Sequence, residues 1–164
     1  MKNEQGFSLI ELLIVVAIIA IIAAIAVPSM LTSRMAANEA GAIQSCRTIG
    51  SAEMAFASVN NQFYRNDLAD RVTAGYLDSR FNGDFNGYNY APGGVAGTTS
   101  DAQDGTGFGF LASPVTNDST GRYQYGIATD QVVRYIATPG SATPPLCGAS
   151  ACTSGQPIGS QSNT

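Results

Sequence analysis

One dense block of apolar residues dominates the start of the chain. Nineteen of the 21 residues in 7–27 are apolar, and no charged residue lies between Glu11 and Arg34. Because a helix of ~20 apolar residues spans the hydrocarbon core of a bilayer, the pattern predicts a transmembrane helix over residues 7–28. Lys2 and the amino terminus give it the positive flank typical of the cytoplasmic side.

A second periodicity follows the apolar block. Across residues 29–60, apolar positions recur at a seven-residue spacing and form a stripe on one helical face. The seven-residue spacing relates Met35, Ala42, Ile49 and Phe56, and the stripe also includes Cys46 and Ala52 beside them. Pro28 lacks a backbone donor and clashes one turn back, so we expect a kink there rather than a helix end. The second, amphipathic half of the helix is therefore predicted to pack against a globular head.

The remainder of the chain predicts short strands and then a polar tail. Over residues 61–138, aromatic and apolar residues alternate with polar ones, which is typical of half-buried antiparallel strands. The alternating positions are Tyr88 and Tyr90, Phe108 and Phe110, Tyr123 to Ile127, and Val133 to Ala137. Turns are predicted at Asn82-Gly83, Asn86-Gly87 and Asp130-Gln131, and a helical turn at Leu68 to Val72. Residues 139–164 are rich in Ser, Thr, Gly and Pro, and we expect an exposed tail. The predicted fold class is α+β, with a long N-terminal helix packed on a small antiparallel sheet.

The composition of the chain argues against several classes of function. The net charge is −4 and only 12% of residues are charged, which argues against a nucleic-acid binder, since such proteins need clustered Lys and Arg. The chain contains no histidine, so the commonest general base and zinc ligand are missing. No nucleophile–base pair, phosphate loop or metal-ligand spacing is present. We therefore expect neither an enzyme nor a bound cofactor.

Two simple interpretations of the apolar block are a cleaved secretory signal and a plain single-pass anchor. Ala24-Ile25-Ala26 imitates a signal-peptidase site. The block is long for a signal sequence, however, and its pattern continues through Pro28 into a second helical stretch. Glu11 also lies inside it, where a carboxylate costs ~2.5–3.5 kcal/mol on insertion scales.

The segment Gly6-Phe7-Ser8-Leu9-Ile10-Glu11 resembles the prepilin signature of type IV pilins and pseudopilins. The resemblance implies that a membrane peptidase cleaves after Gly6 and methylates the new amino terminus on Phe7. It assigns Glu11 to filament assembly and Pro28 to the helix-disturbing proline of the family. Many members carry a glycine midway along the apolar run, where this chain has Ala20.

Physical chemistry gives Glu11 a partner in such a filament. Cleavage leaves a cationic amine on Phe7, and Glu11 of one subunit can meet the Phe7 amine of its neighbour. At ~4 Å and an effective dielectric of ~20, this pair gains ~4 kcal/mol before desolvation. The alternative is a carboxylate that snorkels to the headgroups from the first helical turn, where the helix dipole also favours it.

The resemblance also bears on the cysteines. Cys147 and Cys152 can close a small disulfide loop in an oxidising compartment, in keeping with the family's habit of stapling its carboxy-terminal region. Cys46 is interpreted as a buried small apolar residue. A bridge from Cys46 to a tail cysteine, or three free thiols, stay open as alternatives.

Two weaker patterns are not assigned as sites, and the first of them is better explained as a solvated turn. Asp101 and Asp104 precede a glycine and could supply oxygen ligands to calcium. Asn117-Asp118-Ser119 fits the minimal glycosylation sequon. No metal ligand is therefore assigned.

The resemblance implies a structural subunit of a type IV pilus that serves adhesion, surface motility or DNA uptake. A pseudopilin of a type II secretion system is the alternative, and a secreted globular protein a distant third. The expected partners are other copies of the chain, other pilins, the prepilin peptidase and methyltransferase, an inner-membrane assembly platform and, before assembly, the lipid bilayer. The expected location is the inner membrane, with a cytoplasmic amino terminus, and then an extracellular or periplasmic filament.

Overall fold

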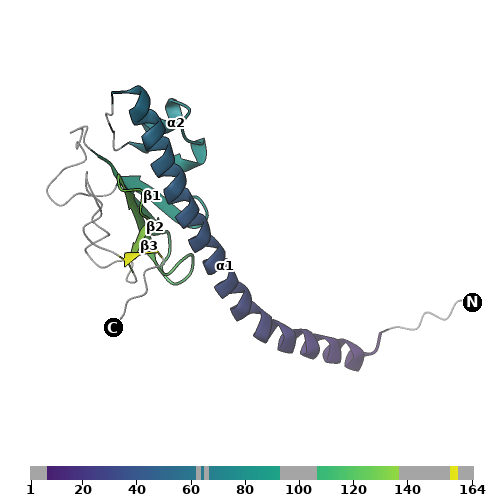
Figure 1. The fold of residues 1–164 in the computed structure, drawn as a ribbon. Helices are drawn as coiled ribbons and strands as arrows, with labels where there is room; N and C mark the ends of the chain where they lie inside the picture. The colour runs from purple at the N-terminus through teal and green to yellow at the C-terminus, as the bar shows by residue number, and fades with distance from the viewer. Residues whose placement is uncertain (1–6, 62–63, 65–66, 93–106, 137–155, 159–164) are drawn as a thin grey trace, which may run out of the picture. The chain divides into compact units, whose positions relative to one another are not determined.

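The structure is a computed structural model that describes residues 7–61, 64, 67–92, 107–136 and 156–158. The chain divides into two compact units, Met1–Arg34 and Met35–Thr164. Each unit is described by itself below, and Figure 1 shows their elements.

One long helix, α1, runs from Leu9 to Val59 and supplies residues to both units. It contains Pro28 in its interior. Its last turn closes at Asn60, whose N–H donates to the Phe56 and Ala57 carbonyls. Asn61 then takes a positive φ of 54°, the left-handed conformation that commonly ends helices. The predicted long N-terminal helix is confirmed.

An antiparallel sheet forms the other half of the Met35–Thr164 unit. Its strands are β1 (Tyr88–Pro92), β2 (Gly109–Pro114), β3 (Gln124–Ala128), β4 (Arg134–Ile136) and β5 (Gln156–Pro157). They lie in the order β1-β2-β3-β4-β5, and every neighbouring pair is antiparallel. The predicted α+β class and four of the strands are therefore confirmed. The sequence did not predict β5, which lies within the expected tail and pairs with β4.

Tight turns set the register of two hairpins. Asn86 and Gly87 have φ values of 52° and 71°, the type I′ geometry that matches strand twist. Phe85 and Tyr88 flank this turn and exchange both main-chain hydrogen bonds, at 2.9 and 3.1 Å. Between β3 and β4, the Gln131 N–H donates to the Ala128 carbonyl at 2.9 Å. Both turns fall where Asn-Gly and Asp-Gln predicted them.

The core lies between the second half of α1 and one face of the sheet, which run alongside each other in Figure 1. On α1 the predicted stripe is buried at Met35, Ala42, Cys46, Ile49 and Ala52, and half-buried at Phe56. On the sheet, cross-strand partners share a face, and the buried set includes Tyr88, Tyr90, Phe110, Ala112, Tyr125 and Ile127. The helical stripe therefore meets the sheet as predicted. Buried and exposed positions alternate in β1, but β2 and β3 each bury four consecutive residues, so the prediction of half-buried strands was wrong for those two.

A buried ion pair connects α1 to the short helix that follows it. Helix α2 (Leu68–Thr73) is capped by Asp67, whose carboxylate accepts from the Ala69 N–H at 2.9 Å. Its Arg71 donates to both carboxylate oxygens of Glu53 on α1, at 2.5 and 3.2 Å, and both side chains are fully buried. The Arg71 guanidinium also lies 3.5 Å from the centroid of the Phe56 ring. The sequence predicted the helical turn but not this pair.

Candidate functional site

The first half of α1 exposes a continuous apolar surface. Sixteen large apolar side chains between Phe7 and Leu31 are exposed, with exposed fractions from 46% at Leu31 to 86% at Phe7. The helix includes a window long and apolar enough to cross a membrane, and none of that window is buried within the chain. Soluble monomers rarely leave so large an apolar area in water. This surface therefore suits a bilayer or the packed interior of an assembly.

Glu11 lies at the start of this helix and caps it. Its Oε2 accepts a hydrogen bond from the Ser8 backbone N–H at 3.0 Å, and its own N–H donates to the Ser8 carbonyl at 3.1 Å. The Ser-x-x-Glu spacing is that of a capping box, in which the Glu satisfies a backbone donor at the helix start. The carboxylate is thus held one residue away from Phe7, close to the backbone that cleavage after Gly6 would turn into an amine.

Pro28 is accommodated inside α1, which is helical on both sides of it and throughout residues 20–28. In the turn that follows, the Thr32 hydroxyl donates to the Ser29 carbonyl at 2.9 Å, and the Ser33 hydroxyl donates to the same carbonyl at 2.9 Å. These bonds satisfy polar side chains within the helix itself. Such satisfaction is needed where a helix leaves an apolar environment.

Besides the Glu53–Arg71 ion pair, the Met35–Thr164 unit buries one thiol and three phenols, and burial favours their neutral forms. Burial raises the pKa of the Cys46 thiol to about 12, and Cys46 is a free thiol. Burial also raises the pKa of Tyr90 to about 12, although the Ser45 hydroxyl acts in the opposite direction. The pKa values of the Tyr88 and Tyr125 phenols rise for the same reason. None of these groups is an activated nucleophile at neutral pH.

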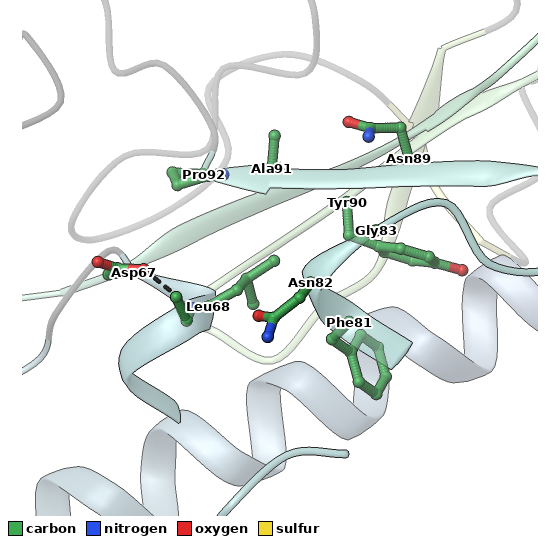
Figure 2. A pocket seen from close by; sticks show the side chains of 10 residues that line it. Asp67, Leu68, Phe81, Asn82, Gly83, Asn89, Tyr90, Ala91 and Pro92 are labelled. Carbon is green, nitrogen blue, oxygen red and sulfur yellow. Dashed lines mark hydrogen bonds between the residues drawn. The ribbon is translucent and has the colours of Figure 1, made fainter. Parts of the chain in front are cut away.

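A shallow pocket lies at the free side of β1 (Figure 2), with a volume of about 220 Å³. It is lined by Asp67, Leu68, Ala69, Phe81, Asn82, Gly83, Asn89, Tyr90, Ala91 and Pro92. These residues come from α2 and its N-cap Asp67, from the short helix η1 (Ser79–Asn82) and its C-cap Gly83, and from β1. No sequence pattern pointed to this pocket, because its walls come from three elements that only the fold brings together.

The other predicted site residues are distributed as follows. Gly6, Cys147 and Cys152 lie outside the described residues, as do Asp101 and Asp104 of the calcium pattern. Asn117 is exposed in the β2–β3 connection and forms a bridge with Gly121. In the described part of the chain, no group of three or more His, Cys, Asp or Glu is placed to hold a metal ion.

Of the predicted residues, Phe7 and Glu11 both lie at the beginning of the exposed apolar helix, where the Glu11 carboxylate is bonded to the N–H of Ser8, the residue after Phe7. It also adds Ser8, which sequence analysis missed. The Ser-x-x-Glu spacing was a readable signal for its role.

Comparison with protein-family models identifies a motif at the start of the chain. Residues 1–27 match the family model of the prokaryotic N-terminal methylation motif. No curated protein matches the chain significantly. The matched residues include Gly6, Phe7, Ser8 and Glu11, together with most of the exposed apolar segment. They point to a structural subunit rather than an enzyme, and to membrane anchoring before assembly. The chain therefore carries, over its first 27 residues, the N-terminal methylation signature of type IV pilins and pseudopilins.

Proposed function

We propose that the chain is a structural subunit of a type IV pilus that serves adhesion, surface motility or DNA uptake. The observation that carries this proposal is the coincidence of the methylation motif in residues 1–27 with an apolar helical surface that the chain leaves uncovered. Burying a Leu, Ile or Val side chain is worth ~1.5–3 kcal/mol. Sixteen exposed large apolar side chains therefore favour lipid before assembly and a filament core afterwards.

In this proposal each segment has one task. Residues 1–6 are a leader, residues 7–28 form the transmembrane and filament-core helix, and residues 29–60 form its amphipathic half. Residues 61–138 form the head, and residues 139–164 a tail in which Cys147 and Cys152 form a disulfide. The unassembled subunit lies in the inner membrane with its amino terminus in the cytoplasm. The assembled filament, a polymer of this chain with other pilins, is extracellular or periplasmic.

Processing gives the first test. A prepilin peptidase that cleaves after Gly6 and methylates Phe7 produces a mature chain whose mass begins at N-methylated Phe7. Gly6→Leu is expected to leave the chain unprocessed in the membrane, because the bulky side chain blocks access to the scissile bond. Mass spectrometry of the mature amino terminus measures both outcomes. A mature chain that begins near Val27 would instead establish a secretory signal peptide.

Assembly gives the second test. Glu11→Ala removes both the cap on the Ser8 N–H and the negative charge, whereas Glu11→Gln keeps an acceptor for the Ser8 N–H and removes only the charge. If Glu11 pairs with the Phe7 amine of a neighbour, both variants insert into the membrane but assemble poorly, because the incoming amine finds no anion.

Matched variants separate this electrostatic role of Glu11 from apolar packing and from helix capping. Val27→Ala trims an exposed apolar residue of the same helix and leaves no charge unpaired, so it should weaken assembly only modestly. Normal assembly of Glu11→Gln, with a defect only in Glu11→Ala, would show that Glu11 acts solely as a helix cap.

Electron microscopy of cells with and without this chain separates pilus from pseudopilin. Long surface filaments that vanish on deletion, and return with the wild-type gene, indicate a pilus subunit. Lost protein secretion with intact pili indicates a pseudopilin of a type II secretion system. The pilus is favoured by the tail cysteines and by the absence of a convincing calcium-ligand pattern in the sequence.

A further inference from the structure

Among the described residues, Tyr90 is the residue on the outer edge of β1 whose N–H and carbonyl both lack a partner. In the β1–β2 pairing, Asn89 lies opposite Ser113 and Ala91 opposite Leu111. The Val115 N–H donates to the Gly87 carbonyl at 3.0 Å, so residues 87, 89 and 91 form the hydrogen-bonded pairs with β2, since these alternate along an antiparallel ladder. The N–H and carbonyl of Tyr90 consequently point away from β2.

The other outward-facing residues of this edge offer no free N–H. Tyr88 uses its outward N–H and carbonyl to pair with Phe85, and Pro92 has no N–H to offer. Among the described residues, no hydrogen bond reaches the Tyr90 N–H or carbonyl from the outer side. The edge therefore offers one donor and one acceptor at Tyr90, directly beside the pocket that Tyr90 lines.

The pocket lies on the face of β1 to which Tyr90 points. Figure 2 shows Leu68, Phe81 and Asn82 on this side of the strand, while the side chains of Asn89 and Ala91 project to the other side. A residue paired with Tyr90 on an added strand would project to the same face as Tyr90. Its side chain would therefore enter the space between Leu68 and Phe81.

The volume of the pocket suits a single side chain better than a free small molecule. Small-molecule sites usually have volumes of ~300–1,000 Å³, whereas this pocket has about 220 Å³. A cavity of ~150 Å³ lined by apolar side chains accommodates benzene. The buried Leu68 and Phe81 supply an apolar wall of this kind, so a branched aliphatic side chain is the natural occupant.

The charged side chains near the pocket also indicate which kind of partner would bind there. The exposed Asp67 carboxylate lines the pocket. The exposed Asp84 lies beside β1, where its Oδ1 accepts from the Asn89 side chain at 2.8 Å on the opposite face of the strand. The whole chain carries a net charge of −4, which disfavours a second copy as the occupant. We propose that this edge binds an extended segment of a partner polypeptide that pairs with the Tyr90 main chain, places a Val, Ile or Leu side chain in the pocket, and carries basic residues next to that anchor. This is β-strand addition at a site in the head, and it holds whether or not the chain forms pili.

The test uses the full chain, isotopically labelled, in detergent micelles. The probe is the blocked peptide acetyl-Thr-Lys-Val-Lys-Thr-amide, followed by NMR titration. We expect saturable shifts of the Leu68, Phe81 and Tyr90 amide signals. N-methylation of the probe's valine removes the donor to the Tyr90 carbonyl, and is expected to weaken binding roughly fivefold, as for one lost hydrogen bond. Replacing both probe lysines by glutamate should abolish the shifts.

A matched pair of variants tests the pocket without unfolding the head. A Cβ placed on Gly83 meets no atom within 4 Å, and the φ of Gly83 is an extended −155°. Gly83→Trp therefore adds bulk at the pocket wall and is expected to abolish binding, whereas Gly83→Ala should bind within about twofold of wild type. Equal melting temperatures of the two variants show that the loss is not a loss of folding.

Several results would overturn the proposal. One is the absence of shifts at millimolar probe, and another is equal binding of the N-methylated and unmodified peptides. Retained binding by Gly83→Trp would place the peptide elsewhere on the chain. Concentration-dependent shifts of the same three signals without any probe would assign the edge to self-association instead.

Discussion

The buried pair between Glu53 and Arg71 provides the sharpest stability prediction. Glu53→Gln keeps the shape of the side chain but removes its negative charge from the pair, in a place where both side chains have no solvent exposure. Removing one partner of a buried pair typically costs ~3–5 kcal/mol, because the remaining charge stays desolvated. For a unit the size of Met35–Thr164, this corresponds to a melting temperature lower by roughly 10–20 °C.

The exposed pair between Asp78 and Arg80 supplies a control. Its atoms are 3.5 Å apart, and both side chains are 57% exposed. Asp78→Asn removes one charge and keeps an oxygen to accept from the Arg80 N–H, so it should change stability by no more than ~1 kcal/mol. The matched comparison isolates the effect of burial.

Near-ultraviolet circular dichroism is a suitable assay for both variants. All seven tyrosines lie between Tyr64 and Tyr135 and the chain has no tryptophan, so the tyrosine signal reports the head alone. The double variant Glu53→Leu/Arg71→Met should recover most of the loss, since apolar replacement of a buried pair is often neutral or stabilising. If Glu53→Gln melts within 3 °C or so of Asp78→Asn, the reasoning about desolvation is refuted.

Two further predictions concern the packing and titration of the head. Gly121→Ala should lower the free energy of unfolding by ~1–3 kcal/mol, because the added methyl meets the ring of the fully buried Tyr88. The Tyr88 ring is held in place by its hydroxyl, which donates to the Tyr123 carbonyl. Gly83→Ala places its methyl in open space and should leave the free energy of unfolding unchanged in the same denaturant titration. The free energy of unfolding should fall as pH rises from 9 to about 12, because Cys46, with its pKa raised from 9.0 to about 12, keeps its proton in the folded head while the unfolded chain loses it. Cys46→Ala should flatten this decline, and an unchanged slope would exclude Cys46 as a contributor. Likewise, iodoacetamide at pH 8 should label Cys46 only after unfolding.

The sequence determined the elements because their signals are local. The apolar block of residues 7–27, the stripe from Met35 to Phe56 and the alternation in the strands each depend on residues a few positions apart. Helical and strand periods differ, so each pattern allows one kind of element. Asn86-Gly87 likewise needed nothing beyond its own residues to predict a type I′ turn. The methylation signature is local as well, since its residues follow one another in the chain.

The tertiary structure decided what depends on residues distant in sequence. Glu53 and Arg71 are 18 positions apart, and no pattern marks them as partners until the chain folds back and removes both from water. Strand β5 was missed because two residues, Gln156 and Pro157, are too short for a periodic signal and form a strand only beside β4. The pocket beside Tyr90 also exists only where α2, η1 and β1 converge. Local periodicity records which side of an element is buried, whereas the identity of the buried neighbour is a property of the packed molecule.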